Sequence, residues 1–146
     1  ELDAASVGIQ RFDVHAPTGF SAQRVTADPG RTRQIIRHLL INAQRYGGPD
    51  VRVVADTTAI HGVIEVRDNG GPIPEREREQ ILEAYGRSRA TAAYPGSVGL
   101  GLSVSRRLAR LMNGEVVYEH VGAESILRLA LPLAPQQHAG VNQAVA

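Results

Sequence analysis

The sequence contains no cysteine and no lysine, and each absence removes a class of chemistry. Without cysteine the chain can form no disulfide, no thiolate metal site and no cysteine nucleophile. The 16 basic residues are all arginine. P-loop NTPases and eukaryotic-type protein kinases each place a lysine on the nucleotide phosphates, so this chain fits neither class.

Long apolar runs and a strong net charge are absent as well. No apolar stretch approaches the roughly 18 residues of a membrane span, and no signal peptide is visible. The net charge of +1 predicts neither a nucleic-acid nor a membrane-surface partner. A chain of 146 residues, 42% of them hydrophobic, is the size of one domain with one core. It begins with Glu1 rather than methionine, which indicates a piece of a longer protein.

The spacing of apolar residues predicts strands that come in neighbouring pairs. The predicted elements are strands 10–15 and 24–27, helix 30–46, strands 51–57 and 62–67, helix 74–85, loop 86–97, helix 100–112, and strands 116–120 and 125–131. Paired strands favour an α/β sandwich with a mixed sheet and helices on one face, rather than a doubly wound sheet. We expect one domain over residues 1–132 and a flexible polar tail over residues 133–146.

The helix predicted over residues 30–46 carries four polar or amphipathic residues along one edge. They are His38, Asn42, Arg45 and Tyr46, at steps of four, three and one. Asn42 stands among apolar neighbours, where its amide needs hydrogen-bond partners. It is either a core asparagine bonded to backbone or an oxygen ligand of Mg²⁺, which prefers few protein ligands and phosphate oxygens.

A run of turn-forming residues follows the strand predicted over 62–67. Asp68-Asn69-Gly70-Gly71-Pro72 is typical of a plain turn. The same run can instead direct a carboxylate into a pocket, because glycine lets a ligand approach the backbone closely. The sequence leaves both interpretations open.

A glycine pair, Gly99 and Gly101, precedes an apolar helical run. Loop glycines at a helix start present free amides and the positive end of the helix dipole, which suit a phosphate. No Gly-Lys-Ser/Thr follows, so this loop is not a P-loop.

These segments occur in a fixed order that resembles the catalytic ATP-binding domain of bacterial sensor histidine kinases. That domain belongs to the superfamily of type II topoisomerase ATPase subunits, heat-shock chaperones and MutL proteins, and its fold is a two-layer α/β sandwich with a mostly antiparallel sheet. The resemblance covers about residues 24–132. It rests on Asn42-Ala43-x-Arg45-Tyr46, Asp68-Asn69-Gly70, Leu82-x-x-Tyr85-x-Arg87, Gly99-Leu100-Gly101-Leu102 and Leu129-x-Leu131-Pro132.

At the nucleobase end, the resemblance implies contacts with the adenine of ATP. Asp68 matches the aspartate that accepts a hydrogen bond from the adenine amino group, and Gly70 matches the glycine that lets the base approach. Tyr46 matches an aromatic position flanking the base. Ile73 and Tyr85 are further implied nucleotide contacts. An aspartate acceptor selects an amino purine over an oxo purine, and thus ATP over GTP.

At the phosphate end, the resemblance implies Mg²⁺ and a ring of donors. Asn42 matches the Mg²⁺ ligand, Arg45 a basic position that reaches the phosphates, and Arg87 an arginine at the terminal phosphate. Residues 86–97 correspond to the ATP lid. The phosphate-binding box comprises Val98, Gly99, Leu100, Gly101 and Leu102. Phosphoryl transfer needs mainly positioning and charge neutralisation, which this set supplies.

Four positions depart from the family pattern. Pro72 stands where a glycine is usual, which removes an N–H and lowers the expected nucleotide affinity. Leu82 replaces an aromatic residue, and Ala123-Glu124-Ser125 replaces a Gly-Thr. His38 stands four residues before Asn42, where relatives have Glu or Asn. It is either a catalytic group, beside Asn42 and Arg87, or only a polar neighbour of the pocket.

No histidine of the chain fits the phosphoacceptor of a histidine kinase, because none is followed by Glu or Asp at the start of a dimerising helix. We therefore expect the acceptor histidine on a dimerisation domain outside this chain, with a response regulator as the later acceptor. The isolated domain is expected to be a cytoplasmic monomer. Two alternatives stay open: a serine kinase of the anti-sigma-factor type, and a degenerate nucleotide-binding regulatory module.

Overall fold

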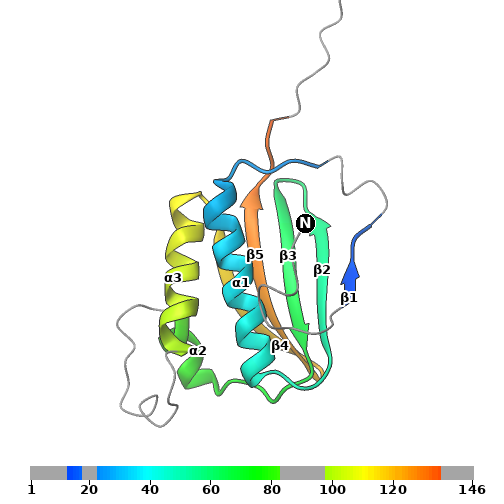
Figure 1. Cartoon of the computed structure of the whole chain (residues 1–146), viewed down its shortest axis with the longest axis vertical. Helices are drawn as coiled ribbons and strands as arrows, with labels where there is room; N and C mark the ends of the chain where they lie inside the picture. Colours follow the sequence, from blue (N-terminus) through cyan, green and yellow to red (C-terminus); the bar gives the residue numbers. More distant parts are fainter. Residues whose placement is uncertain (1–12, 18–22, 83–97, 136–146) are drawn as a thin grey trace, which may run out of the picture.

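The computed structural model describes residues 13–17, 23–82 and 98–135 and shows two layers, with helices on one side of a sheet (Figure 1). The predicted fold class is thereby confirmed. The elements are β1 (Asp13–His15), α1 (Pro29–Tyr46), β2 (Val51–Thr57), β3 (His61–Asp68), α2 (Glu75–Leu82), α3 (Val98–Leu111), β4 (Glu115–Val121) and β5 (Glu124–Pro132).

The sheet has the strand order β1-β2-β3-β5-β4. β1 is parallel to β2, and every other neighbouring pair is antiparallel. The pairing of β3 with β5 joins segments far apart in the chain and places Asp68 opposite Ser125. The ends of α1 and β3 and the starts of α3 and β5 therefore meet at one end of the molecule, the lower end in Figure 1.

α1 begins and ends where the sequence predicts. The Asp28 side chain caps the helix by accepting a 2.7 Å hydrogen bond from the Arg31 amide, and Pro29 occupies the first turn. At the other end the Gly47 amide donates to the carbonyl of Ala43. The buried face of the helix consists of Ile35, Ile36, Leu39, Leu40 and Ala43.

The hydrophobic core lies between the helices and the sheet. Leu39 and Leu40 of α1 and Leu102 of α3 pack there against Val66 and Leu129 of the sheet, all at most 1% exposed. Burial of each of these large side chains contributes about 1.5–3 kcal/mol. This core fixes α1 against α3, and thus the two helices that border the candidate site.

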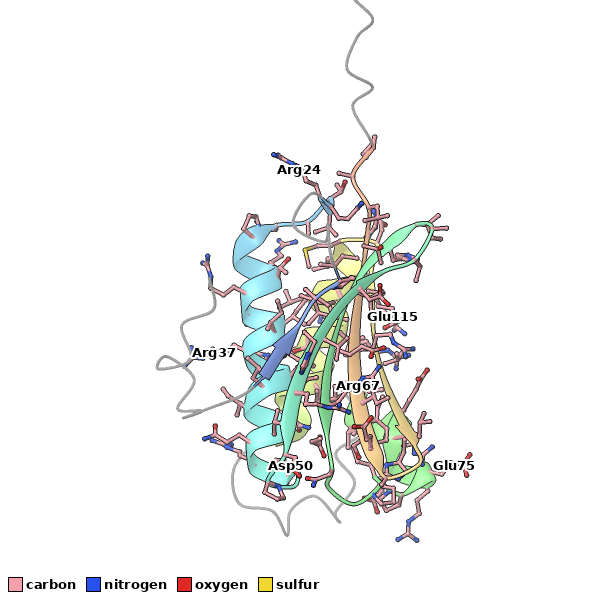
Figure 2. All side chains as sticks on the ribbon, turned by 90° about the vertical axis from the view of Figure 1, so that its right-hand side faces the viewer. Arg24, Arg37, Asp50, Arg67, Glu75 and Glu115 are labelled. Carbon is pink, nitrogen blue, oxygen red and sulfur yellow. The ribbon has the colours of Figure 1, made fainter. Side chains whose placement is uncertain are left out.

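The helix-free face of the sheet carries charged residues, here called the outer face. Glu65 accepts hydrogen bonds from Arg67 and Arg128, and Arg128 also pairs with Glu119. Arg52 and Arg67 pair with Glu124. Figure 2 labels Arg67 on this face. The charges are mutually compensated, which makes this face a structural ion-pair network.

Some expectations differ from the structure. The strand predicted over 24–27 is reduced to a single bridge between Val25 and Leu133, and α3 begins two residues earlier than expected. Hydrogen bonds from the Leu133 and Ala134 amides continue past the expected domain boundary. The segments predicted as a loop over 86–97 and as a tail from residue 133 lie, entirely or from residue 136, outside the described residues, so the boundary at 132 stays a prediction. None of the described helices is both long and apolar enough to span a bilayer.

Candidate functional site

The candidate site begins at Asp68, the last residue of β3. This side chain is buried, with the residue 8% exposed, and its carboxylate accepts hydrogen bonds from the Gly70 amide at 2.8 Å and from the Gly48 amide. Burial raises the pKa of Asp68, while these two amides and the nearby His120 act in the opposite direction. A buried carboxylate held by two backbone donors is a fixed hydrogen-bond acceptor.

Two glycines bring the end of α1 onto Asp68. A Cβ at Gly70 would lie 2.9 Å from the Tyr46 carbonyl oxygen and 2.8 Å from the Asp68 carboxylate. A Cβ at Gly47 would lie 2.8 Å from the Asp68 Cβ. Glycine at 70 is therefore required by the packing of the protein itself, in addition to any ligand. The structure thus brings together Tyr46, Asp68 and Gly70, the predicted nucleobase contacts.

Figure 2 shows this end of the molecule from another direction. Asp50, just before β2, and Glu75, at the start of α2, both lie at the lower end, whereas Arg24 lies at the opposite end. Asp50 and Asn69 join the chain segments at this end, because Asn69 accepts from the Asp50 amide and donates to the Asp50 carboxylate. The turn after β3 is therefore tied to the segment after α1.

A second group of site residues connects α1 to the start of α3. His38 Nδ1 lies 3.0 Å from Ser105 Oγ, and the Ser105 hydroxyl donates to the Gly101 carbonyl at 2.7 Å. Because the single hydroxyl proton of Ser105 goes to Gly101, His38 must donate from Nδ1. The neutral imidazole then has Nε2 as its acceptor atom. Burial is the largest cause of the lowered pKa of His38, so this ring is neutral at pH 7.

The glycine pair lies inside α3 rather than in a loop before it. Because the helix begins at Val98, the amides of its first turn, those of Val98, Gly99 and Leu100, have no carbonyl partner within the helix. A Cβ at Gly101 would meet His38 only at 3.8 Å, an ordinary contact. The protein therefore leaves room at this glycine. Leu102 is 1% exposed, so its side chain belongs to the core.

The remaining predicted residues of α1 lie one and two turns after His38. Asn42 is half-buried, Arg45 is exposed and Tyr46 is 40% exposed. Within the described ranges no three His, Asp or Glu residues cluster as a metal site. A hard cation would thus depend on the Asn42 amide oxygen together with ligand phosphates and water, a donor set that suits Mg²⁺. Tyr85 and Arg87 lie outside the described residues, and the roles of all these residues stay predictions.

Sequence reasoning missed a hydrogen-bonded chain beside Asp68. Tyr118 Oη accepts a 2.9 Å hydrogen bond from the Ile73 amide and lies 3.1 Å from Ser125 Oγ, and His120 Nδ1 lies 3.3 Å from the same oxygen. Ser125 is 5% exposed. The alternation of strands β4 and β5 places all three side chains on the helix-facing side, but only the β3–β5 register brings them to Asp68.

Comparison with known proteins identifies the family. The model of the "Histidine kinase-, DNA gyrase B-, and HSP90-like ATPase" family matches residues 27–135, most of the chain. The chain belongs to this family. Membership confirms the resemblance inferred from the ordered motifs and makes this a domain of nucleotide-binding ATPase type.

The named relatives of this ATPase domain include histidine kinases. The chain is 32% identical over 134 residues to the signal transduction histidine-protein kinase AfsQ2 of Streptomyces coelicolor, covering 90% of this chain and 24% of the relative. It is 31% identical over 137 residues to the sensor histidine kinase GlrK of Escherichia coli, covering 90% of this chain and 28% of the relative. The chain thus spans about a quarter of the length of these relatives.

The fold of the ATPase domain is also found in solved structures. The catalytic domain of histidine kinase ThkA matches with a TM-score of 0.69 and 22% identity, over 88% of this chain and 82% of that one. At this identity the match supports the two-layer fold of the domain.

Proposed function

We propose that this chain is the ATP-binding catalytic domain of a sensor histidine kinase, and that it delivers the γ-phosphoryl group of ATP to a histidine on a dimerisation domain outside the chain. The main support is the buried Asp68 acceptor at the end of β3, packed against the end of α1, with the first turn of α3 at the same end of the fold. Membership of the ATPase family and relatives named sensor histidine kinases agree with it.

At the nucleobase end, Asp68 accepts the hydrogen bond of the adenine amino group. The amides of Gly48 and Gly70 already hold the carboxylate, so little reorganisation is needed on binding. A guanine presents a carbonyl oxygen at the same position, and this oxygen would face the carboxylate without a shared proton. Tyr46, 40% exposed at the end of α1, flanks the base.

At the phosphate end, the amides of Val98, Gly99 and Leu100 donate hydrogen bonds to the phosphate oxygens. Arg45 and Arg87 add positive charge there. Asn42 would hold Mg²⁺, which when bound supplies neutralisation of the phosphate charge.

The phosphorus–oxygen bond to the β-phosphate breaks while a phosphorus–nitrogen bond to the acceptor histidine forms, and ADP leaves. His38, neutral and donating from Nδ1, presents Nε2 as an acceptor for a proton near the reacting group.

The partners follow from this reaction. The acceptor histidine belongs to the dimerisation domain, and a response regulator takes the phosphoryl group afterwards. The substrate ATP places the reaction in the cytoplasm, and we expect the isolated domain to be a monomer.

Titration of the purified domain with a fluorescent ATP analogue and Mg²⁺ tests the proposal. Asp68→Asn and Asn42→Ala should each weaken binding at least about tenfold, since the first removes a charged hydrogen-bond acceptor and the second removes the proposed Mg²⁺ ligand. Asp56→Asn is the matched control, because it makes the same change at an exposed residue near the end of β2. Asp68 lies beside the start of that strand, opposite Val51. Undiminished binding in both site variants would refute the assigned pocket.

A transfer assay separates this function from a binding-only module, which Pro72 and Leu82 favour. Labelled ATP and a supplied dimerisation domain should give a phosphorylated histidine. Nucleotide binding without transfer to any supplied acceptor histidine would contradict the kinase assignment and favour the regulatory alternative.

A further inference from the structure

The backbone of Ile73 is held at both polar groups by side chains from two other elements. Its amide donates to Tyr118 Oη of β4 at 2.9 Å, and its carbonyl accepts from Arg78 Nε of α2 at 3.0 Å. The guanidinium carbon of Arg78 lies 5.6 Å from the centroid of the Tyr118 ring, a cation–π contact. These three residues, here called the Ile73 latch, form a closed set of contacts.

The Ile73 latch extends to the strand beside Asp68. Tyr118 Oη accepts from the Ile73 amide, so its own proton is left for Ser125 Oγ, 3.1 Å away. Ser125 pairs directly with Asp68 in the β3–β5 register. The segment after Asp68 is therefore connected through side chains to the strand position that faces the carboxylate.

This segment has few other restraints in its middle. Residues 69–74 form neither helix nor strand, and a Cβ added at Gly71 would meet nothing within 4 Å. Pro72 has no amide proton, so it cannot contribute a backbone donor of its own. Fixing a free residue costs about 1–2 kcal/mol of conformational entropy, and a segment that is fixed beforehand leaves that cost out of binding.

We propose that Tyr118 and Arg78 are positioning residues, which hold residues 70–73 in the shape that the nucleobase needs. The proposal rests on the proposed nucleotide-binding function of Asp68 and its turn. Loosening the latch should weaken nucleotide binding while the transfer step keeps its rate once nucleotide is bound. ATP and ADP should be affected alike, because both share the adenosine end and the latch lies on that side of the site.

Tyr118→Phe is the sharpest variant, since phenylalanine keeps the ring, its packing and the Arg78 contact and removes only the hydroxyl. The Kd for Mg·ATP and for Mg·ADP should both rise about tenfold, and kcat for transfer to a supplied dimerisation domain should stay within about twofold. Arg78→Ala should act in the same direction. The double variant should weaken binding by less than the product of the two factors, because both side chains hold one peptide unit.

Thr58→Val is the matched control. The Thr58 hydroxyl accepts from the His61 amide at 3.0 Å in the β2–β3 turn, so its removal also breaks a hydroxyl–amide bond, away from the site. It should lower the thermal midpoint and leave both Kd values unchanged. The proposal would be overturned if Kd changed equally in the control and in Tyr118→Phe. It would also be overturned by an unchanged Kd in Tyr118→Phe, or by a loss confined to kcat. A wild-type domain that binds no nucleotide would instead refute the proposed function.

Discussion

His38 is a residue whose protonation state is set by its neighbours. Burial lowers its pKa, and the Ser105 hydroxyl leaves it only the role of donor at Nδ1. A nitrogen-detected NMR titration should find His38 neutral at pH 7 as the Nδ1–H tautomer, titrating below 6.5. Because the folded pKa lies below that of the unfolded chain, His38 makes stability fall as pH drops from 6.5 through the folded pKa. The Nε2–H tautomer would contradict the assigned hydrogen bonds.

Asp68 has the opposite linkage. Its pKa in the folded state is raised above 3.8, so the folded state binds the proton more tightly and ionisation costs stability. Replacing Asp68 by Asn removes that cost. The unfolding free energy of Asp68→Asn relative to wild type should therefore increase as pH rises above about 3.8 and level off above the raised pKa. Urea unfolding of both proteins over this pH range measures the difference, and a difference that falls with pH would show that Asp68 is not desolvated.

At the scale of elements, glycine is present at positions 70 and 101 for different physical reasons. Gly101 in α3 has room for a methyl group, whereas Gly70 is in close contact with Tyr46 and Gly47. Gly101→Ala should raise the unfolding free energy by about 0.5–1 kcal/mol through helix propensity and still weaken nucleotide binding. Gly70→Ala should lower the unfolding free energy by about 1–3 kcal/mol through overpacking.

Chemical denaturation and nucleotide titration of the two glycine variants measure these opposite effects on stability. A Gly101→Ala variant that is more stable and binds nucleotide as well as wild type would show that the first turn of α3 does not approach a ligand.

At the scale of the whole molecule, the outer face stabilises the sheet without reaching the site. Burial alone would raise the pKa of Glu65, but the hydrogen bonds from Arg128 and Arg67 outweigh it and lower that pKa. A carboxylate with a lowered folded pKa adds stability above the unfolded value of 4.5, and this stability is lost as pH falls through the folded pKa. The loss of these ion pairs, as the carboxylates of the outer face are protonated, thus favours unfolding in acid.

Glu65→Gln should lower the unfolding free energy at pH 7 by about 1–2 kcal/mol, because Arg67 and Arg128 lose a charged acceptor. It should also flatten the acid side of the stability profile and leave nucleotide affinity unchanged. Equilibrium unfolding between pH 3 and 7 is the measurement. Weakened nucleotide binding by Glu65→Gln would instead show that the outer face influences the site.

Local signals in the sequence predicted the elements better than their contacts. Asp28-Pro29 and Gly47 located both ends of α1, and alternation located β2. Strand order was not predictable, because apolar periodicity shows which face of a strand is buried but not which strands pair. The same reason hid two site contacts: His38–Ser105 joins residues 67 apart, and Ile73–Tyr118 joins residues 45 apart.

The central claim is that Asp68 recognises an adenine amino group at the end of β3. The most direct measurement is calorimetric titration of the domain with Mg·ATP and Mg·GTP, repeated with Asp68→Asn. We predict that wild type binds ATP at least about 100-fold more tightly than GTP and that most of this preference disappears in the variant. Equal affinities of wild type for the two nucleotides, or a preference that survives in Asp68→Asn, would contradict the account.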